Sequence, residues 1–61
     1  MAQGAVVVGV VDRAERRKGE TSGLLECHLH CVDKNGKDLT IVIPEREVAR
    51  LYSILNVYVK G

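Results

Sequence analysis

The chain has 61 residues, a formal net charge of +1 and 46% hydrophobic residues, with no Phe or Trp and only two Tyr. A chain of this length forms one small domain, here residues 1–61, and buries only about 60% of the surface that its unfolded form exposes. Its core must come from Val, Leu, Ile and Cys, and we expect a homo-oligomer to supplement it. No apolar run approaches the roughly 20 residues of a membrane span, and no secretory leader is recognised, so the sequence predicts a cytoplasmic protein without a membrane partner.

The first predicted strand covers residues 5–11, which are mostly β-branched and apolar on both faces. Two apolar faces imply cover on both sides of the strand. Gly9, in the middle, indicates either a bulge that bends the strand or a plain buried strand that tolerates a glycine. Residues 12–23 follow as a charged loop with glycines at its far end.

Residues 24–32 and 38–43 are the second and third predicted strands, joined by a hairpin turn. A type I turn at Lys34-Asn35, with Gly36 in the left-handed position, makes Asp33 face Lys37. A two-residue turn at Asn35-Gly36 would mix apolar and polar partners, so the longer loop is predicted. The resulting register pairs Cys31 with Leu39, Leu29 with Ile41 and Cys27 with Ile43 on one face, and His30 with Thr40 and His28 with Val42 on the other.

Pro44 is predicted to end the sheet and to occupy the first position of a helix. Asn56 is expected to stop this helix, after which residues 57–59 form a short last strand. The predicted fold is therefore mainly β, in the order β-β-β-α-β. The apolar stripe that docks the helix on the sheet is predicted to be Val48, Leu51, Tyr52 and Leu55.

This order of elements resembles the oligonucleotide/oligosaccharide-binding (OB) fold. The resemblance is architectural and extends from Val6 to Val59. A fifth strand, which closes an OB barrel, has no candidate segment. The prediction is therefore an OB-like or SH3-like small barrel completed by a partner subunit through edge strands, or a four-stranded sheet with a helix. The segments that carry the resemblance are Gly9, Asn35-Gly36, residues 43–45 and residues 57–59.

The OB resemblance implies a ligand face on the second and third strands, next to the first loop. Cations on that loop suit a phosphate backbone, which makes a small module that binds DNA or RNA the first functional prediction. The candidate nucleic-acid-binding residues are Arg13, Arg16, Arg17, Lys18, His28, His30 and Thr40.

The low net charge favours a different class, a protein–protein interaction or assembly subunit that does not bind nucleic acid. The predicted loop also carries acidic residues, namely Asp12, Glu15 and Glu20. Such a subunit would form a homo-oligomer or add a strand to a larger partner. A small-ligand or oxyanion-binding oligomer, like the molybdate-binding small domains, is the third and weakest prediction.

The segment from Cys27 to Cys31 contains two thiols and two imidazoles, which invites a metal-site interpretation. Successive side chains of a strand point to opposite faces, so Cys27 and Cys31 do not converge with His28 and His30. We therefore predict no metal and no cofactor. The same geometry leaves no Cys-His catalytic pair, so the chain is predicted not to be an enzyme. The two Cys α-carbons would be about 13 Å apart, too far for a disulfide, so both are predicted to be reduced.

Overall fold

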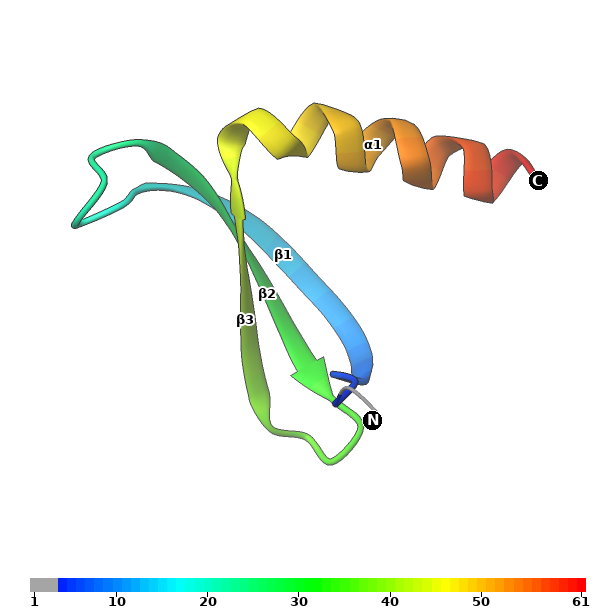
Figure 1. The fold of residues 1–61 in the computed structure, drawn as a ribbon. Helices are drawn as coiled ribbons and strands as arrows, with labels where there is room; N and C mark the ends of the chain where they lie inside the picture. The colour runs from blue at the N-terminus through cyan, green and yellow to red at the C-terminus, as the bar shows by residue number, and fades with distance from the viewer. Residues whose placement is uncertain (1–3) are drawn as a thin grey trace.

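A computed structural model describes residues 4–61 as three antiparallel strands followed by one helix (Figure 1). The strand order in the sheet is β1-β2-β3, so each strand pairs with its neighbour in the sequence and β1 and β3 are the sheet edges. The described residues confirm a mainly β fold, but their sheet is open. The one helix within residues 4–61 is not long and apolar enough to cross a membrane. The elements are β1 (Val8–Lys18), β2 (Leu25–Asp33), β3 (Asp38–Pro44) and α1 (Glu45–Lys60).

The β2–β3 hairpin has the predicted turn and register. The amide of Asp33 donates to the carbonyl of Lys37 at 2.9 Å, and the amide of Gly36 donates to the carbonyl of Asp33 at 3.0 Å. Gly36 has φ +85°, the left-handed conformation of a bulge residue. The Asp33 carboxylate strengthens the turn, because Oδ1 accepts from the amides of Asn35 and Lys37, both at 2.8 Å. All five predicted cross-strand pairs are confirmed.

Replacing Gly36 with alanine is expected to lower the free energy of unfolding by about 1–2 kcal/mol, because a Cβ disfavours the left-handed conformation. Urea denaturation monitored by circular dichroism would measure the change. Gly4→Ala is the matched control, since open space surrounds Gly4 and its φ is ordinary for an L residue. Equal effects of the two substitutions would contradict the importance of the turn geometry.

The first strand is longer than predicted and lies further along the chain. It covers Val8–Lys18 rather than residues 5–11, so the predicted charged loop at residues 12–18 is wrong. Within this segment, pairing with β2 is continuous from Arg13 opposite His30 to Lys18 opposite Leu25. Hydrogen bonding to β2 stabilises the strand although its own sequence lacks apolar periodicity.

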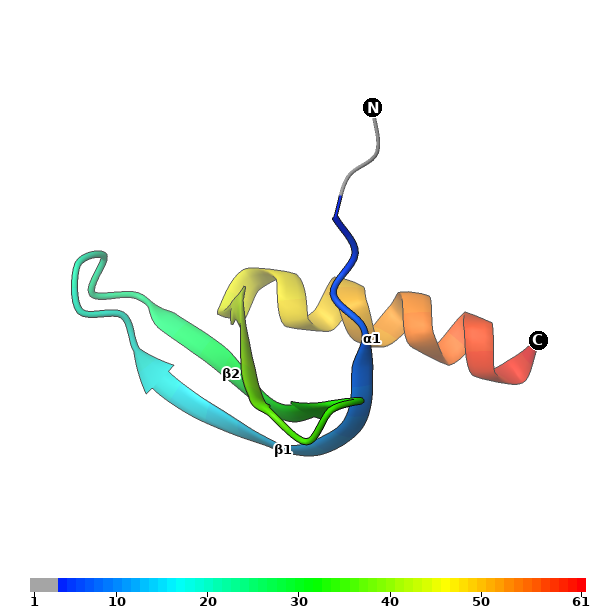
Figure 2. The same ribbon diagram turned by 90° about the horizontal axis from the view of Figure 1, so that it is seen from below.

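Gly9 bends β1, as one of the two sequence interpretations proposed. The register shifts between Val8 and Val10, and a Cβ on Gly9 would lie only 3.0 Å from the carbonyl oxygen of Asp33. A second shift, between Val11 and Arg13, adds another irregularity. Figure 2 shows that β1 curves strongly along its length.

The helix begins and ends later than predicted. Pro44 is the last residue of β3 and the N-cap residue of α1, whereas the first helical residue is Glu45. The helix then continues through Asn56 to Lys60, so the predicted strand at residues 57–59 is wrong and the order is β-β-β-α. An Asn inside a helix lowers its stability by less than about 1 kcal/mol relative to Ala. An already formed helix can continue through it, because extending a helix is much easier than starting one.

One face of the sheet is apolar, because alternate residues of the paired strands share a face. We call the following set the apolar face: Val11 and Ala14 of β1, Cys27, Leu29 and Cys31 of β2, and Leu39, Ile41 and Ile43 of β3. Helix α1 covers only one end of it, where Val48 and Cys27 line one hollow and Leu51 and Ile43 line another. Cys31, 3% exposed, is the single buried residue among residues 4–61.

Candidate interaction surfaces

The opposite face of the sheet carries a charged cluster around Glu15. Oε1 of Glu15 lies 2.9 Å from Nε2 of His30 and 3.6 Å from Nη1 of Arg13. Oε2 lies 3.5 Å from Nε of Arg17. Pairing of β1 with β2 produces this arrangement, since Arg13 is opposite His30 and Glu15 is opposite His28. We call this side of the sheet the polar face.

The polar face brings together most of the predicted nucleic-acid-binding residues. By register it holds Arg13, Arg17, His28, His30 and Thr40. His28 also contacts a neighbour on its own strand, with Nε2 3.2 Å from Oε1 of Glu26.

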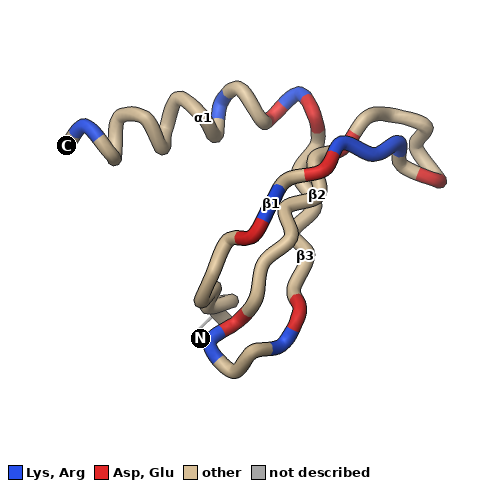
Figure 3. Tube along the Cα trace, turned by 180° about the vertical axis from the view of Figure 1, so that it is seen from behind, with Lys and Arg blue, Asp and Glu red and all other residues tan. Residues whose placement is uncertain are grey.

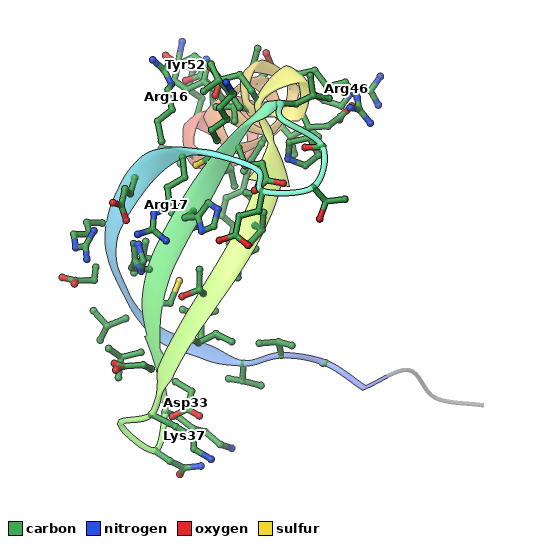
Figure 4. All side chains as sticks on the ribbon, turned by 90° about the vertical axis from the view of Figure 1, so that its left-hand side faces the viewer. Arg16, Arg17, Asp33, Lys37, Arg46 and Tyr52 are labelled. Atoms are coloured by element: carbon green, nitrogen blue, oxygen red, sulfur yellow. The ribbon has the colours of Figure 1, made fainter. Side chains whose placement is uncertain are left out.

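The remaining two predicted residues, Arg16 and Lys18, alternate with Arg17 along β1 and fall on the other side of the sheet. Arg16 reaches α1, where its Nη2 lies 3.1 Å from Oε2 of Glu45. Figure 4 shows the two arginines apart, Arg16 beside the helix and Arg17 over the strands. The four cations therefore do not form one basic surface.

The arginines of the polar face already have a carboxylate partner. Arg13 and Arg17 share Glu15, and Figure 3 shows basic and acidic residues alternating along β1. These pairs are well exposed, and exposed ion pairs contribute only about 0–1 kcal/mol each. A phosphate would have to compete with Glu15 for both guanidinium groups.

The environment of Glu15 lowers the pKa of its carboxyl group below the ordinary value of 4.5. The hydrogen bond with His30 is the largest cause, followed by the charge of Arg17; burial opposes both, and the charge of Arg13 lowers the pKa further. An ionised Glu15 therefore stabilises the folded chain at neutral pH. That contribution is lost as the pH falls below 4.5 and through the lowered pKa of the folded state.

Glu15→Gln is accordingly expected to lower the urea midpoint at neutral pH. The difference from the wild type should narrow on acidification below pH 4.5, where the wild-type carboxyl also becomes neutral. Glu20→Gln, in the turn between β1 and β2, removes the same charge outside the cluster and serves as control. A difference that persists unchanged in acid would contradict the role of the Glu15 charge.

A second surface lies at the end of α1, and the sequence predicted part of it as an exposed last strand rather than as helix. Residues 51–59 contain no charged side chain, and Figure 3 shows this part of the helix without basic or acidic residues. We call residues 51–59 the apolar helix end. Leu55 is 49% exposed and Tyr58 79% exposed. The uncharged run was visible in the sequence, but the strand predicted at residues 57–59 divided it.

Apolar side chains of this helix end cluster on one side. At 3.6 residues per turn, Leu51, Ile54, Leu55 and Tyr58 share a stripe, while Ser53 lies on the opposite side. The stripe continues the side of the helix on which Val48 and Leu51 line hollows at the end of the apolar face. Beyond Ile54, however, α1 extends away from the sheet (Figures 1 and 2).

The chain exposes more surface than a compact protein of its size. Its accessible surface is 5351 Å², against about 3,900 Å² expected for a compact monomer of this mass. The radius of gyration is 13.3 Å, against about 10.5 Å for a compact domain of this length. The excess of accessible surface, about 1,400 Å², indicates that the strands and the helix are formed but cover one another incompletely.

The thiols and imidazoles of β2 lie as strand geometry requires. Cys27 and Cys31 belong to the apolar face and are free thiols, whereas His28 and His30 belong to the polar face. Within residues 4–61, no group of three His, Cys, Asp or Glu side chains is arranged to hold a metal ion.

The fold and surfaces define a three-stranded antiparallel sheet with a projecting, largely uncovered helix. The chain matches no protein-family model, and no curated protein or solved structure is significantly similar to it. Functional inference therefore depends on the surfaces described above.

Proposed function

We propose that this chain is a non-catalytic protein–protein interaction module, which assembles with a partner through the apolar face and the apolar helix end. The observation that carries the proposal is the excess of about 1,400 Å² of exposed surface. This excess counts polar and apolar surface together, and Val11, Ile54, Leu55, Val57, Tyr58 and Val59 are among the exposed large apolar residues. Contiguous exposed apolar patches larger than a few hundred Å² are rare on monomers and mark interaction sites. The apolar stripe of an amphipathic helix normally faces a core, whereas the stripe at the end of α1 is exposed.

The distribution of charge supports the same role. The residues of the apolar face and of the apolar helix end are uncharged, although Arg16 and Lys18 lie on the same side of the sheet at one end of β1. Arg16 is paired with Glu45, so a partner can cover both surfaces without burying an unpaired arginine. The charged cluster around Glu15 lies on the polar face, which stays available to water.

Association through sheet edges is a further element of this proposal. The two register shifts and the alternating charges of β1 are features that protect an edge from pairing, so β3 is the edge better suited to a partner strand. Closure into an OB-like or SH3-like barrel would need strands from such a partner. Free Cys27 and Cys31 suit a reducing compartment, which is why we place the assembly in the cytoplasm.

Multi-angle light scattering and thermal unfolding across a dilution series test the proposal. We expect a species heavier than 6.7 kDa, or a partner-bound complex, and a Tm that rises with protein concentration if the partner is identical. A folded monomer at all concentrations that also fails to bind any protein would overturn it.

Nucleic-acid binding is the second candidate, favoured by one observation: Arg13, Arg17, His28 and His30 share the polar face. If it is correct, the double variant Arg13→Ala/Arg17→Ala should weaken oligonucleotide binding and reduce its dependence on salt, because each phosphate contact adds to the salt slope. Fluorescence anisotropy in a salt titration measures both.

The matched control for that experiment is Lys34→Ala/Lys37→Ala, which removes two cations from the β2–β3 turn at the other end of the sheet. Figure 4 shows Lys37 at that turn, far from Arg17. Equal losses for the two double variants would indicate nonspecific attraction, and no binding at low salt would exclude this candidate.

A further inference from the structure

We propose that the partner is a second copy of this chain, and that the apolar helix end of each copy packs across the apolar face of the other. This inference rests on the proposed function above and specifies both the partner and the mode of packing. A two-fold arrangement makes the contact reciprocal, because the same two surfaces then meet twice.

The amount of uncovered surface fits a dimer. If each copy covers its excess of about 1,400 Å², the two together bury roughly 2,800 Å². Obligate homodimers bury about 2,000–5,000 Å² in total, whereas standard transient interfaces bury about 1,600 Å². The chain therefore has an excess of exposed surface that is typical of a subunit that folds together with its partner.

The direction of α1 leaves the apolar face of its own chain only partly covered. The first three turns lie over the end of this face, where Val48, Leu51 and Ile54 line hollows with Cys27 and Ile43, and the remaining turns then leave the sheet (Figure 1). Val11, on the same face of β1, stays 60% exposed. The helix of another copy can reach this region because its apolar end projects freely.

Packing of the helix on the sheet also covers more apolar surface than packing of one helix on the other. A pair of α1 helices would cover Ile54, Leu55 and Tyr58 but leave the apolar face open. Reciprocal helix-on-sheet packing covers both surfaces of both copies at once. It brings together two mainly apolar surfaces, and it leaves the Glu15 cluster on the outside.

A photo-crosslinking experiment on the full chain tests this packing. Tyr58 is replaced with p-benzoylphenylalanine, which keeps an aromatic ring, and the variant is mixed with uniformly ¹⁵N-labelled wild type before irradiation. Trypsin separates the three regions, because cleavage at Lys and Arg yields residues 19–34 with β2, residues 38–46 with β3 and residues 51–60 with the helix end. The same replacement at Ser53, on the opposite side of α1, is the matched control.

We expect peptide 51–60 of the variant to be joined to ¹⁵N-labelled peptides 19–34 or 38–46, and these products to be lost when the probe is at Ser53. Joining of peptide 51–60 to ¹⁵N-labelled peptide 51–60 alone would overturn helix-on-sheet packing but leave an assembly module. A folded monomer without intermolecular products would overturn the dimer itself, and binding of another protein would then decide whether the proposed function survives.

An isotope-filtered nuclear Overhauser experiment on mixed labelled and unlabelled wild type provides a second measurement without substitution. Contacts between the ring of Tyr58 in one copy and methyl groups of Leu29 or Ile41 in the other are expected. Their absence in a sample that scatters light as a dimer would contradict the packing.

Discussion

Cys31→Asp is expected to prevent folding of the chain. Cys31 is the most deeply buried residue, at 3% exposure, and it lies at the centre of the apolar face between Val11 and Leu39. Placing a carboxylate there without a partner costs several kcal/mol, or requires its protonation. The free energy of unfolding of a domain of this length is only about 3–9 kcal/mol, so the cost of the buried carboxylate is comparable to the total stability. Circular dichroism at neutral pH would show an unfolded chain.

Two control substitutions test whether unfolding is caused by the buried charge, rather than by loss of the thiol or by an added charge at any position. Cys31→Ala removes the thiol without adding charge and should remain folded with a modest loss of stability. Thr40→Asp adds the same carboxylate to the polar face, where Thr40 is exposed and paired with His30, and should be tolerated. Unfolding of Thr40→Asp as well would show that the chain tolerates no added charge, and burial of Cys31 would not be the reason.

The β2–β3 hairpin was predictable because its determinants are local. Asp33 and Gly36 define the turn, and the turn sets the register of every pair that follows. The alternation of cysteines and histidines then assigns the two faces of β2, so that the apolar face and the histidine side of the polar face follow from the sequence.

The path of β1 was not predictable, since it depends on pairing with residues distant in the sequence. Considered alone, residues 12–18 resemble a solvated loop, because charged and apolar residues do not alternate along them as they do in a half-buried strand. Beside β2 they form a strand, and the alternation of that strand separates Arg16 from Arg17. The predicted basic loop thereby becomes a polar face on which Glu15 pairs with the arginines.

The end of α1 was not predictable from propensity because two tendencies compete. Val57 and Val59 favour strands, and Asn56 is a plausible helix stop. A strand at residues 57–59 would need an adjacent strand, however, whereas a helix satisfies its hydrogen bonds within itself. At the end of α1, the amide of the C-cap residue Gly61 donates to the carbonyl of Val57 at 3.0 Å. With the helix continued, an apolar surface appears that the predicted strand had concealed.

Leu55→Glu is expected to weaken self-association by at least about 100-fold. Burial of one leucine contributes about 1.5–3 kcal/mol, the substitution is present in both copies, and each 1.4 kcal/mol corresponds to a factor of ten. The buried charge adds to this loss. Because the isolated chain has one buried residue among those described, we expect the Tm of the variant to fall together with its association constant.

Ser53→Glu is the decisive control for that substitution, because Ser53 lies about 160° around the helix from Leu55 and two residues away. It introduces the same charge and the same change in helix propensity to within a few tenths of a kcal/mol, yet it lies outside the apolar stripe. Analytical ultracentrifugation of the two variants would separate the effects. If Leu55→Glu alone dissociates the assembly, the apolar stripe of α1 is the interface. If both variants dissociate equally, the effect comes from net charge, and if neither does, the assembly uses the free edge of β3 or another surface.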